Sequence, residues 1–322
     1  MTSNKASFAY IRKRGVRAAI TEMLEYHQRG YNVVLKADIE SFFDTVNVDD
    51  LLSKLIFPSL EDDTLNTLIK KTFEMEIGNR ESLSEQDKKL FPLGNVGLPQ
   101  GGYLSPIFSN IYLAGFDHIM LDKKFRMIRY ADDFIVMCKT VDQAKEAYIL
   151  AKDVLEQELK LKLHEMDDSN KNAKTKILEL GKHKIQFLGI QFDGKRILPD
   201  PEKKRELSND LTTIRNEAKT VIELLIKTRN LLQGWIASYS FTDLTEDYLN
   251  SIDSEVDKII WSTLGSLEWR LKPRLQLSEI QRLNSGIKPV VWHLNNVRRK
   301  YPTLEKDLLE KYWTQDTQKS SN

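Results

Sequence analysis

The stretch Phe125-Arg-Met-Ile-Arg-Tyr-Ala-Asp-Asp-Phe-Ile-Val-Met-Cys138 decides how this sequence of 322 residues is interpreted. Apolar, aromatic and β-branched residues flank its two acids, which is the composition of strands. Asp132 and Asp133 fall where a hairpin would turn, because Asp tolerates turn conformations that β-branched residues avoid. Two adjacent carboxylates stay ionised only beside a cation. The stretch therefore predicts a β-hairpin with a metal-binding tip; an ordinary solvated Asp-Asp turn is the alternative.

A second acid stands at the end of an earlier predicted strand. Val33 to Leu35 form an apolar run that predicts a buried strand, and Asp38 stands where it gives way to Ile39 and Phe43. A carboxylate at a strand end is placed to share a metal ion with the Asp132-Asp133 turn. For Asp38 taken alone, a helix N-cap is an open alternative.

A glycine-rich loop precedes a predicted helix. Gly94-Asn-Val-Gly-Leu-Pro-Gln-Gly-Gly102 packs four glycines and a proline into nine residues. Ser105 and Pro106 then stand at the predicted N-cap and first position of a helix. Glycines let the backbone approach a ligand closely, and a helix N-terminus favours anions. The loop therefore predicts contact with an anionic ligand.

The overall composition excludes several classes of protein. With 48 Lys and Arg against 47 Asp and Glu, the net charge of +1 creates no global positive field for nucleic acid. The single cysteine, Cys138, excludes an internal disulfide framework and a Cys-rich zinc site. No run approaches the ~20 apolar residues that span a bilayer, and the N-terminus lacks the apolar region of a signal peptide. We therefore expect a cytoplasmic protein that binds no membrane.

Most of the remaining chain is predicted to be helical. Apolar periodicity indicates helices over Val16–His27, parts of 48–92, Val141–Leu163, Lys203–Lys227 and Leu244–Leu264. Thr175–Leu180 and Lys184–Phe192 predict a strand pair that turns at Gly181.

Positive charge gathers toward the C-terminus. Between residues 270 and 300, where Glu279 is the only acid, the basic residues are Arg270, Lys272, Arg274, Arg282, Lys288, Arg298, Arg299 and Lys300. Trp269 and Trp292 lie in or beside this block, and basic residues interleaved with aromatics suit a nucleic-acid backbone. We predict such contacts at Arg270, Lys272, Arg274, Arg298, Arg299 and Lys300, with a solvated helical face as the alternative.

Taken in order, these stretches resemble the reverse transcriptases of the bacterial, group II intron-like branch. The similar segments are Phe8–Ile20 (fingers), Leu35–Asp44, Gly97–Pro106 with Asn110–Leu113, Tyr130–Asp133, Lys174–Lys176 (palm motifs), Phe187–Gly189 (primer grip) and Gly234–Tyr239 (thumb). The likeness covers roughly residues 8–270. It implies an α+β right-hand polymerase fold, with a palm of a small antiparallel sheet plus helices, partial fingers and a helical thumb.

The resemblance also implies the domain organisation. Residues 1–30 would be partial fingers, 31–195 the palm with inserted fingers helices at about 48–92, and 196–322 the thumb and basic C-terminal region. The chain begins inside the fingers, so a protein partner or an oligomer is expected to complete them. A downstream Cys/His zinc segment or endonuclease segment is also missing, which disfavours an intact mobile intron-encoded protein.

Roles for individual residues follow from the same resemblance. Asp38, Asp132 and Asp133 would be catalytic and, with the Ile39 carbonyl, would hold two Mg²⁺ or Mn²⁺ ions about 3.5–4 Å apart. Nucleotide contacts are expected from Arg14, Phe43, Gln100, Gly101 and Lys174, and primer contacts from Phe187, Leu188 and Gly189. The ring of Phe43 would exclude a 2′-hydroxyl and so select deoxynucleotides.

The expected function is an RNA-directed DNA polymerase, with a dedicated non-coding RNA as template, in antiphage defence. Untemplated or protein-primed DNA synthesis by the same fold is one alternative, which the near-neutral charge supports. A non-enzymatic, maturase-like RNA-binding cofactor is another, disfavoured because all three catalytic acids are present.

Overall fold

The computed structural model describes residues 4–73, 84, 96–99, 101–170, 172–266, 286 and 288–300. By its internal contacts the chain divides into two compact units, Met1–His183 and Lys184–Asn322. The sequence placed the end of the palm near residue 195, whereas the contacts group residues 184–195 with the second unit. Among the described helices, none is both long and apolar enough to cross a membrane.

The first unit is built on a four-stranded antiparallel sheet. Its strands, in the spatial order β2-β3-β1-β4, are β1 (Val33–Asp38), β2 (Arg126–Tyr130), β3 (Asp133–Cys138) and β4 (Lys176–Glu179). β2 and β3 form the predicted hairpin, with Tyr130 paired to Asp133. β3 also pairs with β1, and this register places Asp38 directly opposite Asp133.

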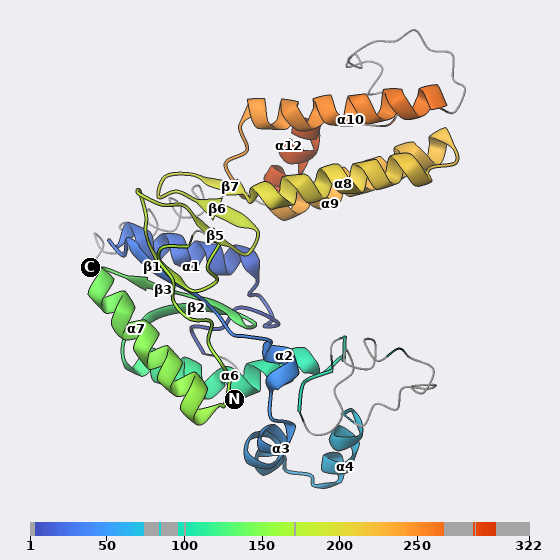
Figure 1. Ribbon diagram of the computed structural model, residues 1–322. Helices are drawn as coiled ribbons and strands as arrows, with labels where there is room; N and C mark the ends of the chain where they lie inside the picture. Colours follow the sequence, from blue (N-terminus) through green and yellow to red (C-terminus); the bar gives the residue numbers. More distant parts are fainter. Residues whose placement is uncertain are drawn as a thin grey trace, which may run out of the picture. The chain divides into compact units, whose positions relative to one another are not determined.

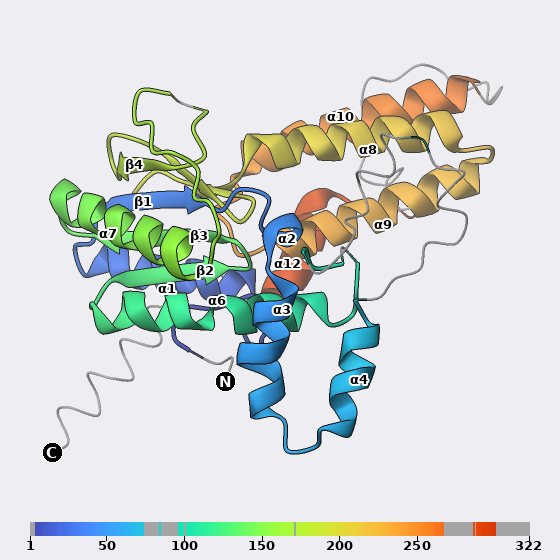
Figure 2. The ribbon, with the colours of Figure 1, turned by 60° about the horizontal axis from the view of Figure 1, so that its bottom comes forward.

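Helices cover both faces of this sheet. The long helices of the unit are α1 (Val16–Gln28), α6 (Ser105–Asp122) and α7 (Val141–Asp153). Figure 1 shows the sheet between α1 on one side and α6 with α7 on the other, and Figure 2 shows α6 and α7 side by side. This double cover explains why β3 is apolar and buried from Phe134 to Cys138.

Alternation along β3 divides its side chains between the two cores. Phe134, Val136 and Cys138 belong to the large apolar core that α6 and α7 share with the sheet. Ile135 and Met137 point the opposite way, toward α1, because successive strand side chains alternate between faces. The β2–β3 hairpin is therefore held from both sides.

Shorter elements complete the first unit. They are α2 (Phe42–Thr45), α3 (Val48–Asp50), the π-helical η1 (Leu51–Ile56), the 3₁₀ turn η2 (Phe57–Ser59), α4 (Thr64–Lys71) and the π-helical η4 (Val154–Glu158). The helix predicted over Val16–His27 is confirmed as α1. The helix predicted over Val141–Leu163 forms as α7 and η4 but ends at Glu158, because Leu163 pairs with Ile39 instead. α6 begins at Ser105 itself, with Leu104 as its N-cap, because the Ser105 hydroxyl donates to the Pro99 carbonyl at 2.6 Å.

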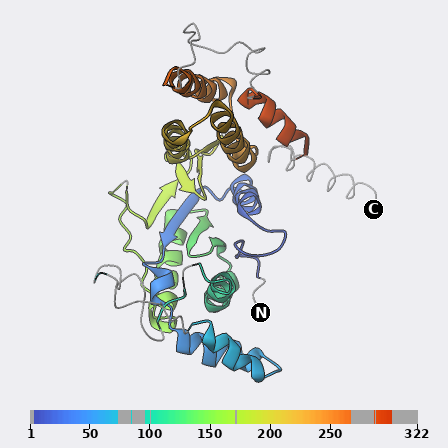
Figure 3. The ribbon, with the colours of Figure 1, turned by 90° about the vertical axis from the view of Figure 1, so that its right-hand side faces the viewer.

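The second unit joins a small sheet to a group of helices. Its elements are β5 (Ile185–Phe187), β6 (Ile190–Phe192), β7 (Ile197–Pro199), α8 (Pro201–Glu217), α9 (Val221–Tyr239), α10 (Glu246–Ser266) and α12 (Val290–Lys300). β5, β6 and β7 pair antiparallel in chain order. Figure 3 views α8, α9 and α10 nearly end-on, packed around the apolar core that they share with α12. The predicted α+β class is confirmed.

Two predictions for this part of the chain are wrong. β4 does not pair with the strand after Gly181; it adds to β1 in the first sheet, and residues 185–192 form a separate hairpin. The helix predicted over Lys203–Lys227 is two helices, because Thr220 starts a new one: its hydroxyl accepts the Glu223 amide at 3.1 Å.

Candidate active site

The three predicted catalytic acids meet where β1 and the β2–β3 hairpin lie side by side. Asp38 ends β1, Asp133 begins β3 opposite it, and Asp132 occupies the turn between β2 and β3. Residues directly opposite in an antiparallel pair have Cβ atoms about 4.5–5.5 Å apart. Residues almost a hundred positions apart in the sequence therefore present carboxylates to one small region.

The turn that carries the acids has an unusual backbone. Ala131 has a φ of 58°, in the left-handed region that non-glycine residues adopt at a cost. Its carbonyl accepts a hydrogen bond of 2.8 Å from Arg129, whose guanidinium is fully buried. A strained turn persists only where its surroundings over-determine it. Holding this turn in one conformation therefore lowers the stability of the folded protein.

The acids perturb one another. Burial raises the pKa of Asp132, and the nearby Asp38 raises it further, whereas Lys174 lowers it. Burial raises the pKa of Asp133 to about 6, opposed by Lys36 and reinforced by Asp38 and Asp132. One Asp133 oxygen, Oδ1, is buried with no hydrogen-bond partner. The site is thus a concentration of negative charge with an unsatisfied oxygen.

Two basic side chains contact the Asp38 carboxylate. Lys174 places its Nζ 2.9 Å from Oδ2, and His164 places its Nε2 3.6 Å from the same oxygen. The other ring nitrogen of His164 lies 3.4 Å from Glu40 Oε1. The sequence predicted Lys174 as a nucleotide contact and did not single out His164 or Glu40. His164 reaches the site because Leu163 pairs with Ile39.

The donor set fits a hard divalent cation in its chemistry. Asp38, Asp132 and Asp133 supply carboxylates. Ile39 and Leu163 form a β-bridge whose two hydrogen bonds do not use the Ile39 carbonyl, so that oxygen is not occupied by the bridge. Such oxygens suit Mg²⁺ and Mn²⁺. Within the part of the chain that the structure describes, no three acidic, His or Cys side chains already converge as a ligand set. The partnerless Asp133 oxygen is the atom that a cation would satisfy.

A pocket of about 580 Å³ adjoins this region. Its walls are Tyr10, Phe43, Gly101, Gly102, Tyr103, Ser105 and Pro106. Tyr10 connects the pocket with the acids: burial raises the pKa of its hydroxyl, and the nearby Tyr130 and Asp132 raise it further. The volume lies within the range of about 300–1,000 Å³ that ligand pockets occupy.

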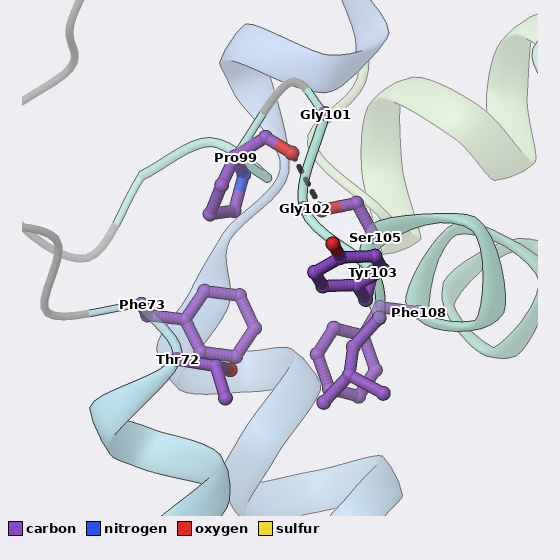
Figure 4. A pocket seen from close by; sticks show the side chains of 9 residues that line it. Thr72, Phe73, Pro99, Gly101, Gly102, Tyr103, Ser105 and Phe108 are labelled. Carbon is purple, nitrogen blue, oxygen red and sulfur yellow. Dashed lines mark hydrogen bonds between the residues drawn. The ribbon is translucent and has the colours of Figure 1, made fainter.

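The glycine loop also borders a second pocket, of about 310 Å³. Figure 4 shows its apolar side, where the rings of Phe73 and Phe108 stack with centroids 5.2 Å apart. The loop turns so tightly that a Cβ on Gly102 would lie 2.8 Å from Ser105 Oγ and 3.1 Å from the Pro99 carbonyl oxygen. Only glycine fits there, which gives the predicted close backbone approach a physical cause.

A family model described as reverse transcriptase (RNA-dependent DNA polymerase) matches residues 2–192, more than half of the chain. This chain belongs to the reverse transcriptase family. The match includes all three acids, the glycine loop and the whole four-stranded sheet.

Individual proteins are similar over much of the chain. Protein YkfC of Escherichia coli (strain K12) is 29% identical over 257 residues, which are 66% of this chain and 62% of YkfC. Two solved telomerase structures, from Candida albicans with a fragment of telomeric RNA and from Candida tropicalis in the apo form, match with TM-scores of 0.40 and 0.42 at 13% and 14% identity. They cover 97% and 91% of this chain. The chain spans only 54% and 52% of the telomerase chains.

Arg14, the predicted triphosphate contact, is engaged with the chain itself. Its Nη1 donates to the carbonyls of Asn4 and, at 2.6 Å, Ser7. Its guanidinium carbon lies 5.3 Å from the centre of the Phe8 ring. Arg14 therefore organises the N-terminal segment, and its contact with a nucleotide stays a prediction.

The predicted primer grip forms a tight hairpin in the second unit. Leu188 and Gly189, between β5 and β6, have φ values of 50° and 77°. Two consecutive positive φ angles are typical of the hairpin turns that match strand twist. A Cβ on Gly189 would lie 3.2 Å from the Tyr239 hydroxyl, so glycine also permits close packing on α9. Phe187 is buried, and the role of all three residues in primer binding stays a prediction.

The predicted nucleic-acid contacts differ in their surroundings. Gln100, Arg270, Lys272 and Arg274 lie outside the described residues, as does the side chain of Lys300. Arg298 donates to the carbonyls of Ser240 at 3.1 Å and Thr242 at 2.8 Å, and burial lowers its pKa. Arg299 is exposed on α12. Of the described basic residues, Arg299 is therefore better placed than Arg298 to meet a phosphate.

Proposed function

We propose that this chain catalyses RNA-templated DNA synthesis, adding deoxynucleotides to a primer by a two-metal-ion mechanism. The carrying observation is the meeting of Asp38, Asp132 and Asp133 beside a pocket of nucleotide-compatible size, in a member of the reverse transcriptase family. Asp38, Asp132, Asp133 and the Ile39 carbonyl are the proposed ligands. Bound Mg²⁺ or Mn²⁺ would neutralise charge on the phosphoryl oxygens and activate the primer 3′-hydroxyl.

The pocket residues supply positioning and charge. Ser105 and Pro106 place the N-terminus of α6 in the pocket wall, where the helix dipole favours a negative triphosphate. Gly101 and Gly102 let the backbone come close to it. Lys174, an exposed side chain that pairs with Asp38 at 2.9 Å, is free to turn to a phosphate once a cation neutralises Asp38. We propose this exchange as the role of Lys174.

The decisive experiment measures incorporation of labelled deoxynucleotides by purified protein with Mg²⁺, on a primed RNA template and without nucleic acid. Wild type should extend the primer only with template, and Asp132→Ala should reduce the rate by at least about a hundredfold, because placed charge dominates phosphoryl transfer. Asp153→Ala, on an exposed residue of α7, is the matched control and should keep full activity.

Other outcomes would redirect the proposal. Product without template, lost in Asp132→Ala, would favour untemplated or protein-primed synthesis, which the net charge of +1 also supports. No product in either arm would contradict polymerase activity and favour an RNA-binding role. Retained synthesis in Asp132→Ala would refute the assignment of the acids.

Phe43 is proposed to exclude ribonucleotides. It is half-buried in the pocket wall, and its ring is held edge-on by buried Phe42, with ring centroids 5.3 Å apart. Phe43→Ala should raise ribonucleotide relative to deoxynucleotide incorporation by about tenfold or more, since the site would lose its steric clash with the 2′-hydroxyl. Phe43→Tyr keeps the ring and should keep the selection. Unchanged selection in Phe43→Ala would end the steric-gate proposal.

The biological setting rests on motif resemblance alone. Placement in the group II intron-like branch, a dedicated non-coding RNA, a partner that completes the fingers, a cytoplasmic location and a part in antiphage defence all stay predictions. Sequencing of the RNA that co-purifies with the protein would test the first two: one abundant species with a defined fold is expected, and a random sample of cellular RNA would contradict it.

A further inference from the structure

Arg129 is the largest of the fully buried side chains in the described part of the chain. It lies on β2, whereas Arg126 on the same strand is exposed. Its guanidinium donates to both carboxylate oxygens of Asp117 on α6, from Nε to Oδ1 at 2.6 Å and from Nη2 to Oδ2 at 2.5 Å. Two parallel hydrogen bonds between planar groups fix their relative orientation as well as their distance. Arg129 is therefore immobilised by α6.

The remaining guanidinium nitrogen of Arg129, Nη1, reaches the turn between β2 and β3. Nη1 donates to the Ala131 carbonyl at 2.8 Å and to Asn110 Oδ1 at 3.2 Å. The Ala131 carbonyl belongs to the peptide that leads into Asp132. Arg129 thus binds the turn at Ala131, the residue with the left-handed backbone that directly precedes the two acids.

The N-terminal segment holds Arg129 and its partners from the other side. Asn4 donates from Nδ2 to Asp117 Oδ2 at 2.7 Å, and its Oδ1 accepts the Ser7 amide at 3.0 Å. The Ser7 hydroxyl donates to Asn110 Oδ1 at 3.0 Å, and the backbone of Ser7 pairs with that of Arg129. Asn4, Ser7, Asn110, Asp117 and Arg129 are all buried. They form one buried polar network that converges on the turn.

We propose that Arg129 is a positioning residue for the catalytic turn: anchored by Asp117, it holds the Ala131 carbonyl and so sets the direction of the Asp132 and Asp133 carboxylates. It does this without touching substrate. The effect on turnover rests on the proposed function, whereas the effect on the turn itself rests on geometry alone.

The test compares Arg129→Lys with Tyr112→Phe. Lysine keeps the positive charge but cannot reproduce the planar fork. Tyr112 is a buried residue of α6, the helix that carries Asp117. Its hydroxyl donates to the Leu159 carbonyl at 2.8 Å, away from the turn. The rate of nucleotide addition per folded molecule and amide hydrogen exchange at Asp132 and Asp133 are measured for both variants.

Arg129→Lys should lower turnover roughly 10–100-fold, because small misplacements of reacting groups are costly, while the KM for deoxynucleotide changes little. Amide exchange in the turn should accelerate about tenfold, since the local opening becomes easier. Tyr112→Phe should change neither quantity after correction for the folded fraction. Equal effects in the two variants, or wild-type behaviour of Arg129→Lys, would overturn the proposal.

A rescue distinguishes positioning from a general role in the core. Glycine adopts a positive φ without steric cost, so Ala131→Gly added to Arg129→Lys should restore part of the lost turnover. A glycine in the turn could not repair a purely structural loss at the Asp117 pair. No recovery in the double variant would therefore contradict positioning.

If Arg129→Lys does not fold, Asn4→Ala tests the same network with a smaller perturbation, because the pair of Arg129 and Asp117 stays intact. It should accelerate exchange at Asp132 and Asp133 by a few-fold; no acceleration would contradict the network's hold on the turn. If wild type makes no DNA, the proposed function fails, and the exchange measurements still decide whether Arg129 holds the turn.

Discussion

Two cation–carboxylate pairs belong to the candidate site, one beside the turn and one at Asp38 itself, and they are built in opposite ways. Arg129 and Asp117 are both 0% exposed and meet through two hydrogen bonds. Lys174 and Asp38 meet through one contact of 2.9 Å, with side chains 61% and 23% exposed. Loss of one member of the buried pair leaves an uncompensated charge in the core, whereas exposed pairs contribute little to stability.

The difference separates two tasks that an active site must combine. The buried pair lies in a polar network with Asn4 and Asn110, and Arg129 also donates to the Ala131 carbonyl in the turn. Lys174 in the exposed pair is accessible to solvent, so under the proposed mechanism Asp38 would be available for a metal ion and the Lys174 ammonium for a phosphate. Under the proposed mechanism, the buried pair would hold the geometry of the turn and the exposed pair would exchange partners during the reaction.

The largest expected effect comes from breaking the buried pair. Asp117→Ala should lower the free energy of unfolding by about 3–5 kcal/mol, because Arg129 would remain buried without its counter-charge. Urea denaturation followed by circular dichroism measures the change. Asp153→Ala, on the exposed side of α7, should change stability by less than about 0.5 kcal/mol. Similar small losses in both variants would refute the distinction between the pairs.

An intermediate effect of opposite sign is expected at the acids themselves. The pKa of Asp133 is raised from 3.8 to about 6, so the folded state binds this proton more tightly than the unfolded state does. The stabilisation of the folded state by the protonated Asp133 carboxyl is complete below pH 3.8 and is lost as the pH rises through about 6. Asp133→Asn carries no such charge, so without metal it should be more stable than wild type by about 1–3 kcal/mol above pH 6, and the difference should shrink toward pH 4.

Thermal unfolding at several pH values with a chelator present measures this difference. Asp153→Asn is the control for loss of a carboxylate and should show no comparable pH dependence. An Asp133→Asn variant that is less stable than wild type at pH 7 would show that the buried carboxylate does not destabilise the folded state.

The smallest effect is expected at the exchangeable pair. Lys174→Met should change the free energy of unfolding by no more than about 1 kcal/mol, because exposed pairs are weak. The pKa of Asp132 should rise further, since Lys174 now lowers it. Denaturation and carboxyl NMR titration measure the two quantities. A stability loss as large as that of Asp117→Ala would erase the contrast between the pairs.

Local sequence was sufficient to predict the β2–β3 hairpin and the neighbouring strand β1. The apolar runs on both sides of Asp132 and Asp133 encode strands by composition alone, and Asp-rich turns are local features. The burial of β3 on both faces is also visible in its unbroken apolar run. The same reasoning placed Asp38 correctly at a strand end, where the register with β3 brings it opposite Asp133.

Pairing between distant segments was not predictable in this way. β4 was assigned to its neighbour in sequence, but it pairs with β1, whose residues stand far upstream. The start of α9 carried a local signal that was missed: Thr220 followed three residues later by Glu223 is typical of a helix N-terminus. Arg129 also carried a signal, because a cation in a strand covered on both faces requires a buried partner, although nothing in the sequence identifies Asp117.

The backbone contact between Ser7 and Arg129 also bears on how the protein is made. Ser7 leaves the ribosome first, and at roughly 5–20 residues per second the chain up to Arg129 needs on the order of 10 s more. During that interval the Asn4 amide and the Ser7 hydroxyl lack their partners Asp117 and Asn110 until α6 has also emerged. Both strands of the hairpin, β2 and β3, must emerge before the N-terminal segment can dock. Nascent chains that end before Arg129 therefore lack the polar network around the turn, which forms late in the synthesis of the first unit.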